Sequence, residues 1–287
     1  ALAVLRDAPA LELLALDLSR NILPPASAGP LAALGRLRTL GALHLDLAHN
    51  ALGDAGARGL AALGGAPALH TLHLHLGANQ IGPGGAEGLA ELRRVPALHT
   101  LSLFLPHNAL QPDGAQALAA LKAAPGLRTL LLDLAHNQLG NGGAQALAEL
   151  REAPALEDLH LRLDSNKVGE AGAQALAELR QAPALRTLGI ALARNFVGDG
   201  GAKALAALGG GAALRALFLN LSDNQVCDGG GETLRALATA PGLTTLHLNV
   251  SYNFVGEQGT QALTDLTQGP QQCSICVNPQ LETGASR

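Results

Sequence analysis

One asparagine recurs at an unbroken spacing of 29 residues through this chain of 287 residues, and that spacing limits the fold more than any other feature. An exact period of this length is typical of a solenoid, in which each repeat buries its apolar face only against its neighbours. Since the register never slips, we expect one elongated domain. The equivalent asparagines are Asn21, Asn50, Asn79, Asn108, Asn137, Asn166, Asn195, Asn224 and Asn253.

The residues before each asparagine follow one pattern, in which leucine alternates with other residues. In the unit that ends at Asn79, the leucines are Leu69, Leu72, Leu74 and Leu76. A period of two predicts a strand with the leucines on one face and the variable residues on the other. Burial of each leucine stabilises the fold by about 1.5–3 kcal/mol, so the leucines are predicted to form the core. We expect each asparagine to bond backbone groups of its own bend and of the next coil, forming a ladder.

After the asparagine, the apolar residues change to helical spacing. In the unit of Asn137, the residues Ala144, Leu147 and Leu150 share one helical face, and the helix is expected to continue until Pro154 ends it. Strands lie about 4.7–4.9 Å apart while helices are about 10 Å wide, so the stack must curve with its sheet inside. The predicted fold is an α/β horseshoe solenoid with a parallel sheet on the concave face and helices on the convex face.

The two ends of the array depart from the regular unit. Residues 1–10 are predicted to be the end of a preceding repeat, 11–270 nine repeats, 271–279 a capping strand and 280–287 a tail. A looser helix is expected in the first unit, because Pro24 and Pro25 follow Asn21. The last strand keeps only Ile275 and Val277 in the leucine positions.

The pattern L-x-x-L-x-L-x-L-x-x-N resembles the leucine-rich repeat family, and in length and helix signature the ribonuclease-inhibitor-like subclass. The run GAQALA from Gly114 to Ala119, with copies at Gly143 and Gly172, also resembles GALA-type repeats of bacterial effectors. An extra x-L pair before the asparagine departs from the usual family pattern and predicts a longer strand. The resemblance implies a protein-binding horseshoe, with an enzyme inhibitor or the substrate-recognition array of a ubiquitin-ligase adaptor as special cases.

Composition excludes several classes of function. A net charge of −4 gives no electrostatic case for nucleic acid, which requires a basic face. No apolar run of about 18 residues is present, so membrane insertion is not expected. Three cysteines, Cys227, Cys273 and Cys276, are too few for a disulfide framework and favour a reducing, intracellular compartment. Phosphate-loop, zinc-protease and nucleophile-elbow motifs are absent, so a non-enzymatic protein without a cofactor is predicted.

The positions six and four residues before each asparagine, here called the inner columns, are predicted to face the concave side. They vary from unit to unit while the leucines do not, as expected of a reading surface on a constant scaffold. We therefore expect a scaffold that binds another protein on this face, either by itself or as a rigid accessory subunit of a larger assembly. The residues predicted to contact the partner are Asp17, His44, Asp46, His73, His75, Phe104, Asp133, His160, Arg162, Phe218, Asn220, His247, Asn249 and Tyr252.

Histidines in the inner columns suggest a second interpretation. His44 and His73 are expected on neighbouring strands, with Asp46 and His75 two residues along, at separations of about 5 by 7 Å. Such a group has the ligand types for Zn²⁺, whose bonds to nitrogen and oxygen are about 2.0–2.2 Å long. Filling of exposed strand positions is the alternative explanation.

A second candidate lies toward the C-terminal end, where aromatic side chains gather in a chain that is 2 % aromatic. Such residues are favoured as anchors at protein interfaces. Shielding of the last coil explains them equally well. The group consists of Phe218, His247, Tyr252, Phe254 and Cys276.

Overall fold

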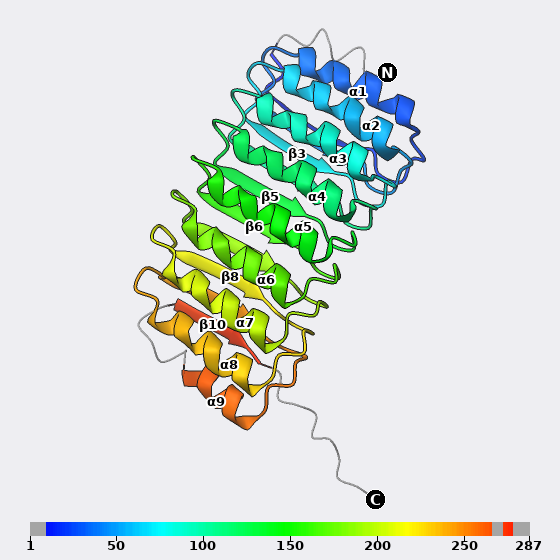
Figure 1. Ribbon diagram of the computed structural model, residues 1–287. Helices are drawn as coiled ribbons and strands as arrows, with labels where there is room; N and C mark the ends of the chain where they lie inside the picture. Colours follow the sequence, from blue (N-terminus) through cyan, green and yellow to red (C-terminus); the bar gives the residue numbers. More distant parts are fainter. Residues whose placement is uncertain (1–9, 266–271, 278–287) are drawn as a thin grey trace, which may run out of the picture.

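The computed structural model describes residues 10–265 and 272–277, which form a single stack of repeats. Figure 1 shows the helices side by side along one face of the stack, with the strands behind them. The strands are β1 (Leu13–Asp17), β2 (Ala42–Asp46), β3 (Thr71–His75), β4 (Thr100–Phe104), β5 (Thr129–Asp133), β6 (Asp158–Arg162), β7 (Thr187–Ala191), β8 (Ala216–Asn220), β9 (Thr245–Asn249) and β10 (Gln272–Cys276). The α-helices are α1 (Ala28–Ala32), α2 (Gly53–Leu60), α3 (Pro83–Ala90), α4 (Gln111–Ala119), α5 (Gly140–Leu147), α6 (Glu170–Leu176), α7 (Gly198–Ala206), α8 (Asp228–Leu234) and α9 (Glu257–Asp265).

The sheet is parallel throughout and follows chain order from β1 to β10. Its first nine strands pair in a register that joins residues 29 apart, such as Leu43 with Leu72. The last pairing joins residues two closer in sequence, Leu246 with Cys273. The predicted curved α/β solenoid is confirmed. The structure of residues 1–9 and of the tail 280–287 lies outside the described residues.

The leucines that point away from the inner columns form one continuous core between sheet and helices. Leu72, Leu74 and Leu76 are each 0 % exposed, and the equivalent leucines of the neighbouring coils are buried with them. In the first coil, Leu14 and Leu16 are only partly buried. Each interior leucine is therefore held by the coils on both sides, as the repeat pattern requires.

The strands are shorter than the sequence pattern predicts. β3 ends at His75, so Leu76 lies one residue beyond the strand. Its backbone N–H nevertheless donates to the carbonyl of Phe104 at 2.7 Å. The extra x-L pair therefore continues the hydrogen bonding between coils past the end of the strand and does not lengthen the strand itself.

The helical half of each unit is composite, where a single α-helix was predicted. In the fifth repeat, α5 ends at Leu147 and a 3₁₀-helix follows from Ala148 to Glu152. Such tighter turns are frequent at helix ends, where they satisfy the last carbonyl groups. In the first unit, α1 has only five residues, whereas α6 has seven and α4 nine, in agreement with the weaker helix expected there.

Each interior asparagine joins two coils, as Asn137 illustrates. Its side chain is 0 % exposed, and its Oδ1 accepts the N–H of Leu110 at 3.2 Å. Its Nδ2 donates to the carbonyls of Leu105 at 2.8 Å and Leu134 at 3.1 Å. Leu105 and Leu110 belong to the preceding coil, so the link runs backward along the chain and not to the next coil as predicted.

The residue immediately before each of these nine asparagines has a left-handed backbone, which the sequence did not indicate. Its φ lies between +54° and +58°, although none of the nine is glycine. A left-handed conformation costs a residue with a Cβ about 1–2 kcal/mol, so the bend that leaves the sheet is strained in every coil. The nine residues are Arg20, His49, Ala78, His107, His136, Ser165, Arg194, Asp223 and Tyr252.

Candidate functional site

The inner columns face away from the leucine core, and several of their rings stack between neighbouring strands. The ring centroids of His44 and His73 are 4.4 Å apart. Those of His75 and Phe104 are 4.1 Å apart, with an interplanar angle of 20°. Because neighbouring strands lie about 4.8 Å apart, planar side chains at paired positions come into contact. The concave face between β2 and β4 is therefore covered by stacked rings.

The half-buried His73 lies in the middle of this histidine group. Burial lowers the pKa of its imidazole, and the neighbouring His44 and His75 lower it further, because each would repel a second positive charge. The fold therefore favours the neutral form of this ring.

The histidine group does not form the metal site that was considered from the sequence. Among residues 10–265 and 272–277, no group of three or more histidine, cysteine, aspartate or glutamate side chains is arranged to hold a metal ion. His44 and His73 stack tilted by 34°, whereas ligands must direct their nitrogens at one point. Asp46 is occupied by the backbone N–H of Ala48, at 2.9 Å. These contacts do not favour the zinc interpretation.

Aspartate and asparagine in the second inner column have a structural role that the sequence analysis missed. Asp46 Oδ1 accepts the N–H of the residue two positions further on, which closes the turn at the end of the strand. Four further inner-column residues do the same for their own turns. These are Asp17 with Ser19, Asp133 with Ala135, Asn220 with Ser222 and Asn249 with Ser251.

Asp133 is less available to a partner than its column suggested. It is 6 % exposed, and its Oδ2 lies 3.2 Å from Nη1 of Arg162 on the next strand. The side chain of Arg162 remains 55 % exposed. Arg162 therefore presents a guanidinium group on the concave face, held in place by a buried carboxylate.

The predicted aromatic cluster divides into two groups. Phe218 and His247 stack on the concave face, with ring centroids 4.8 Å apart and planes 6° from parallel. Tyr252 lies beyond the strands, where it is 75 % exposed and lines a separate cavity with Arg194 and Asp164. Burial raises the pKa of Asp164, against the effect of the N–H that Ala193 donates to it. Tyr252 is therefore a residue of the rim and not of the inner columns.

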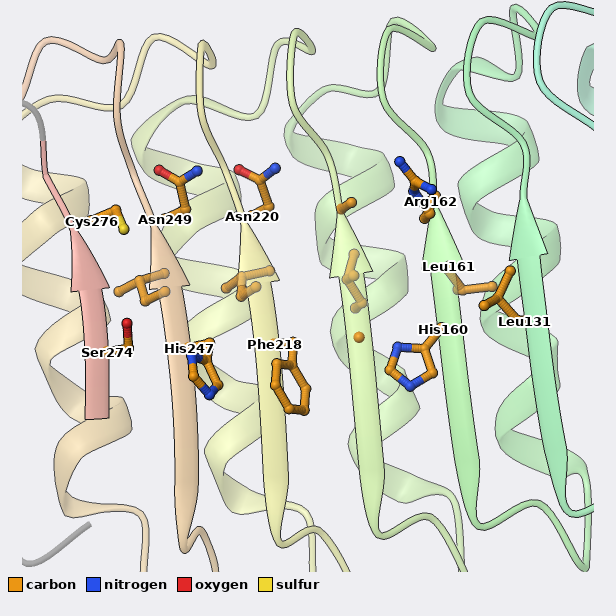
Figure 2. Close-up of a pocket in the computed structure, with 15 residues that line it drawn as sticks. Leu131, His160, Leu161, Arg162, Phe218, Asn220, His247, Asn249, Ser274 and Cys276 are labelled. Atoms are coloured by element: carbon orange, nitrogen blue, oxygen red, sulfur yellow. The ribbon is translucent and has the colours of Figure 1, made fainter. Parts of the chain in front are cut away.

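A depression of about 390 Å³ opens on the concave face over strands β5 to β10 (Figure 2). On β7 it is lined by Gly189 and Ala191, which are the smallest residues of the two inner columns. The rings of His160 and Phe218 stand on either side of Gly189, with centroids 6.3 Å apart. The lining residues predicted from the sequence as partner contacts are His160, Arg162, Phe218, Asn220, His247 and Asn249. The depression itself was not predicted, although the pair of small residues on β7 was its signal.

Comparison with known proteins agrees with the class of fold, a solenoid of parallel strands and short helices. A family model described as Leucine Rich repeat matches residues 43–61, 68–90, 126–148 and 159–177. No curated protein sequence gives a significant match. These four segments match leucine-rich repeats. Such repeats indicate a scaffold for protein–protein interaction. Assignment of the chain to the ribonuclease-inhibitor-like subclass stays a prediction.

Two solved structures are similar, both from Listeria monocytogenes. One is an internalin that is 17 % identical, with a TM-score of 0.46, and the match covers 87 % of this chain and 71 % of that chain. The other is an internalin C2 that is 22 % identical, with a TM-score of 0.45, and the match covers 79 % of this chain and 76 % of that chain. In the part of the chain that the structure describes, no helix has the length and apolar character to cross a bilayer.

Proposed function

We propose that this chain is a non-enzymatic scaffold that binds another protein on its concave face, as a free protein or as a rigid subunit of a larger assembly. The observation that carries the proposal is the contrast between the two sides of each strand. The core side is leucine in coil after coil, whereas the inner columns carry rings, amides and charges in a different combination on each strand. Large planar residues such as Phe104 and Phe218 are frequent anchors at interfaces.

The face is also prepared for binding. Ring stacking and turn hydrogen bonds fix the inner side chains before a partner arrives, and ordered side chains lose less conformational entropy on binding. His75 against Phe104 and Phe218 against His247 are the clearest examples. Because the backbone beneath them is a continuous parallel sheet, the partner meets a surface whose shape is set by the scaffold.

Two matched triple variants test the proposal. The first replaces concave residues, with His44→Ala, Phe104→Ala and Phe218→Ala. The second replaces exposed helix glutamines at one equivalent position, with Gln116→Ala, Gln145→Ala and Gln174→Ala. Both variants and the wild type are immobilised on separate supports and incubated with extracts of cells that make the protein. The proteins that each support retains are quantified by mass spectrometry.

We expect proteins retained by the wild type to be lost from the concave variant and kept by the helix variant, while circular dichroism shows all three folded. Loss from the helix variant alone would place binding on the convex face and contradict the proposal. Equal retention by both variants would contradict it as well.

A further inference from the structure

We propose that the depression over β7 binds an extended peptide segment of the partner that carries an aromatic side chain and, two residues away, a carboxylate side chain. This inference rests on the proposed function, because it names the chemistry recognised at one place on the concave face. The depression has two halves, one formed around Gly189 and the other around Ala191.

The half around Gly189 is suited to an aromatic side chain. Gly189 has no side chain, and the ring of His160 fills the place that a Cβ there would take. On the other side, Phe218 is supported from behind by His247, at a centroid distance of 4.8 Å. The ring of His160 lies on the other side of Phe218, at a centroid distance of 6.3 Å (Figure 2). A flat side chain that takes the place of the His160 ring stacks on Phe218 and continues the row that His247 begins.

The half around Ala191 is lined by hydrogen-bond donors. The Oδ1 atoms of Asn220 and Asn249 are used by backbone N–H groups, at 3.1 and 3.0 Å. Their Nδ2 groups have no partner among the described residues, and Figure 2 shows the amide nitrogen of Asn220 on the side of Arg162. Arg162 contributes N–H groups beyond the one that faces Asp133.

Arg162 adds a charged donor to this half of the depression. Among the described residues, Arg162 is the only aspartate, glutamate, lysine or arginine that lines the depression. Two carboxylates lie near it outside the lining, Asp133 and Asp164. Asp133 holds the guanidinium of Arg162, and Asp164 accepts the N–H of Ala193 at 2.8 Å. The free groups of Arg162, Asn220 and Asn249 are all hydrogen-bond donors, and such a set recognises a carboxylate. A hydrogen bond between charged groups is about twice as strong as a neutral one.

The spacing between the two halves selects the kind of segment. Gly189 and Ala191 are two residues apart on one strand, which corresponds to about 6.6 Å. Side chains at positions i and i+2 of an extended peptide lie on one face at the same spacing. A chain-terminal carboxylate lies nearer to its own side chain. The geometry therefore favours an aromatic residue and an aspartate or glutamate with one residue between them.

The probes are three synthetic peptides that differ at one position. They are Ac-Gly-Ser-Phe-Ser-Asp-Ser-Gly-NH2 and its versions with Asn or Lys in place of Asp, so that every peptide lacks a free carboxyl terminus. Binding to the full chain is followed by nuclear magnetic resonance, with amide shifts mapped onto the structure. We expect the Asp peptide to bind at least about 10-fold more tightly than the Asn peptide, which corresponds to about 1.4 kcal/mol, and to shift β7 and β8 resonances.

One conservative variant isolates the donor half. Asn220→Asp keeps the acceptor for Ser222, as Asp46 does at the equivalent position of another coil, but it replaces the free donor by a carboxylate oxygen. The matched control is Asn141→Asp, which makes the same change of charge on the helix side. There Asn141 accepts the N–H of Gly169 at 2.7 Å. Asn220→Asp should remove the preference for the Asp peptide and favour the Lys peptide, while Asn141→Asp should change neither.

The outcomes separate this inference from the proposed function. If all three peptides bind the depression equally, or if Asn220→Asp and Asn141→Asp behave alike, the carboxylate inference is overturned and binding on the concave face stands. If no peptide binds, or if the shifts map elsewhere on the protein, the depression is not the peptide site. The triple variants then decide the proposed function independently.

Discussion

The carboxylate of Asp199 accepts a hydrogen bond from the backbone N–H of Cys227 at 2.6 Å, across the boundary between two coils. Asp199 lies in the first turn of α7, and Cys227 is the residue that precedes α8. Asp228 repeats the contact one coil later, on the N–H of Gly256 at 2.7 Å. The amino terminus of a helix is therefore capped by the neighbouring coil, where capping by its own preceding side chain is usual.

Removal of this contact should weaken the junction between the two coils. We expect Asp199→Ala to lower the free energy of unfolding by about 1 kcal/mol, the usual contribution of a helix cap. The matched control is Asp113→Ala in the first turn of α4, because Asp113 accepts no hydrogen bond among the described residues. Urea unfolding followed by circular dichroism measures both. An equal effect of the two substitutions would show that helix-dipole charge, and not the contact between coils, is responsible.

The asparagine that follows each strand should contribute to the free energy of unfolding only where it lies between two coils. Asn137→Ala removes bonds to both its own coil and the preceding one, and it leaves buried backbone groups unpaired at about 1–3 kcal/mol each. Asn21 is exposed, and among the described residues its side chain donates only to the carbonyl of Ser19, at 3.0 Å. We expect a loss of at least about 2 kcal/mol for Asn137→Ala and less than about 0.5 kcal/mol for Asn21→Ala in urea unfolding. Similar losses would contradict the bridging role.

The strained bend predicts a substitution that stabilises the protein. Ala78 has a φ of +54°, which glycine adopts without steric cost. We expect Ala78→Gly to raise the free energy of unfolding by about 0.5–1 kcal/mol, although glycine also makes the unfolded chain more flexible. The control is Ala55→Gly, at an exposed helical position of α2, which should cost about 1 kcal/mol. A loss of stability in both variants, measured by thermal unfolding, would refute strain at the bend.

Stability should fall on mild acidification because of His73. Its pKa in the folded protein is below the ordinary value of 6.5, so its contribution is complete above that value and is lost as the pH falls through the folded-state pKa. The titratable groups that act on it are His44 and His75. We expect His73→Phe to lose less stability than the wild type between about pH 7.5 and pH 5.

The control for this pH dependence is the exposed His99, replaced by Gln. His99→Gln should leave the loss of stability on acidification as it is in the wild type. An unchanged loss in His73→Phe would assign the effect to other groups on the concave face.

The fold could be predicted from the sequence because its determinants lie within one coil. Alternation of Leu72, Leu74 and Leu76 sets the buried side of the strand, and the fixed spacing of the asparagines sets the register. The contacts of Asp199 with Cys227 could not be predicted in the same way, because they join different coils and depend on a rotamer as well as on spacing. The left-handed residues were missed for another reason. Tertiary packing imposes that backbone, and residues such as Ala78 carry no local signal for it.

The candidate site was predicted in outline only. Assignment of the inner columns followed from strand alternation, which does not depend on what each side chain contacts. Which residues stay available does depend on those contacts. Asp133 is less available to a partner because it forms an ion pair with Arg162, and Asp46 is less available because it accepts the hydrogen bond that closes its own turn. The position of the depression depends on a contrast in size between β7 and the strands beside it, which becomes visible only once neighbouring units are aligned.

Photo-cross-linking at two matched aromatic positions tests the binding face most directly. Phe218 on the concave face and Phe196 in a loop beyond the sheet are 36 % and 57 % exposed. Each is replaced in turn by p-benzoylphenylalanine, and the protein is irradiated in extracts of cells that make it. We predict discrete adducts with another protein from position 218 that the wild type competes away, and none from position 196. Adducts from position 196 alone would contradict binding on the concave sheet.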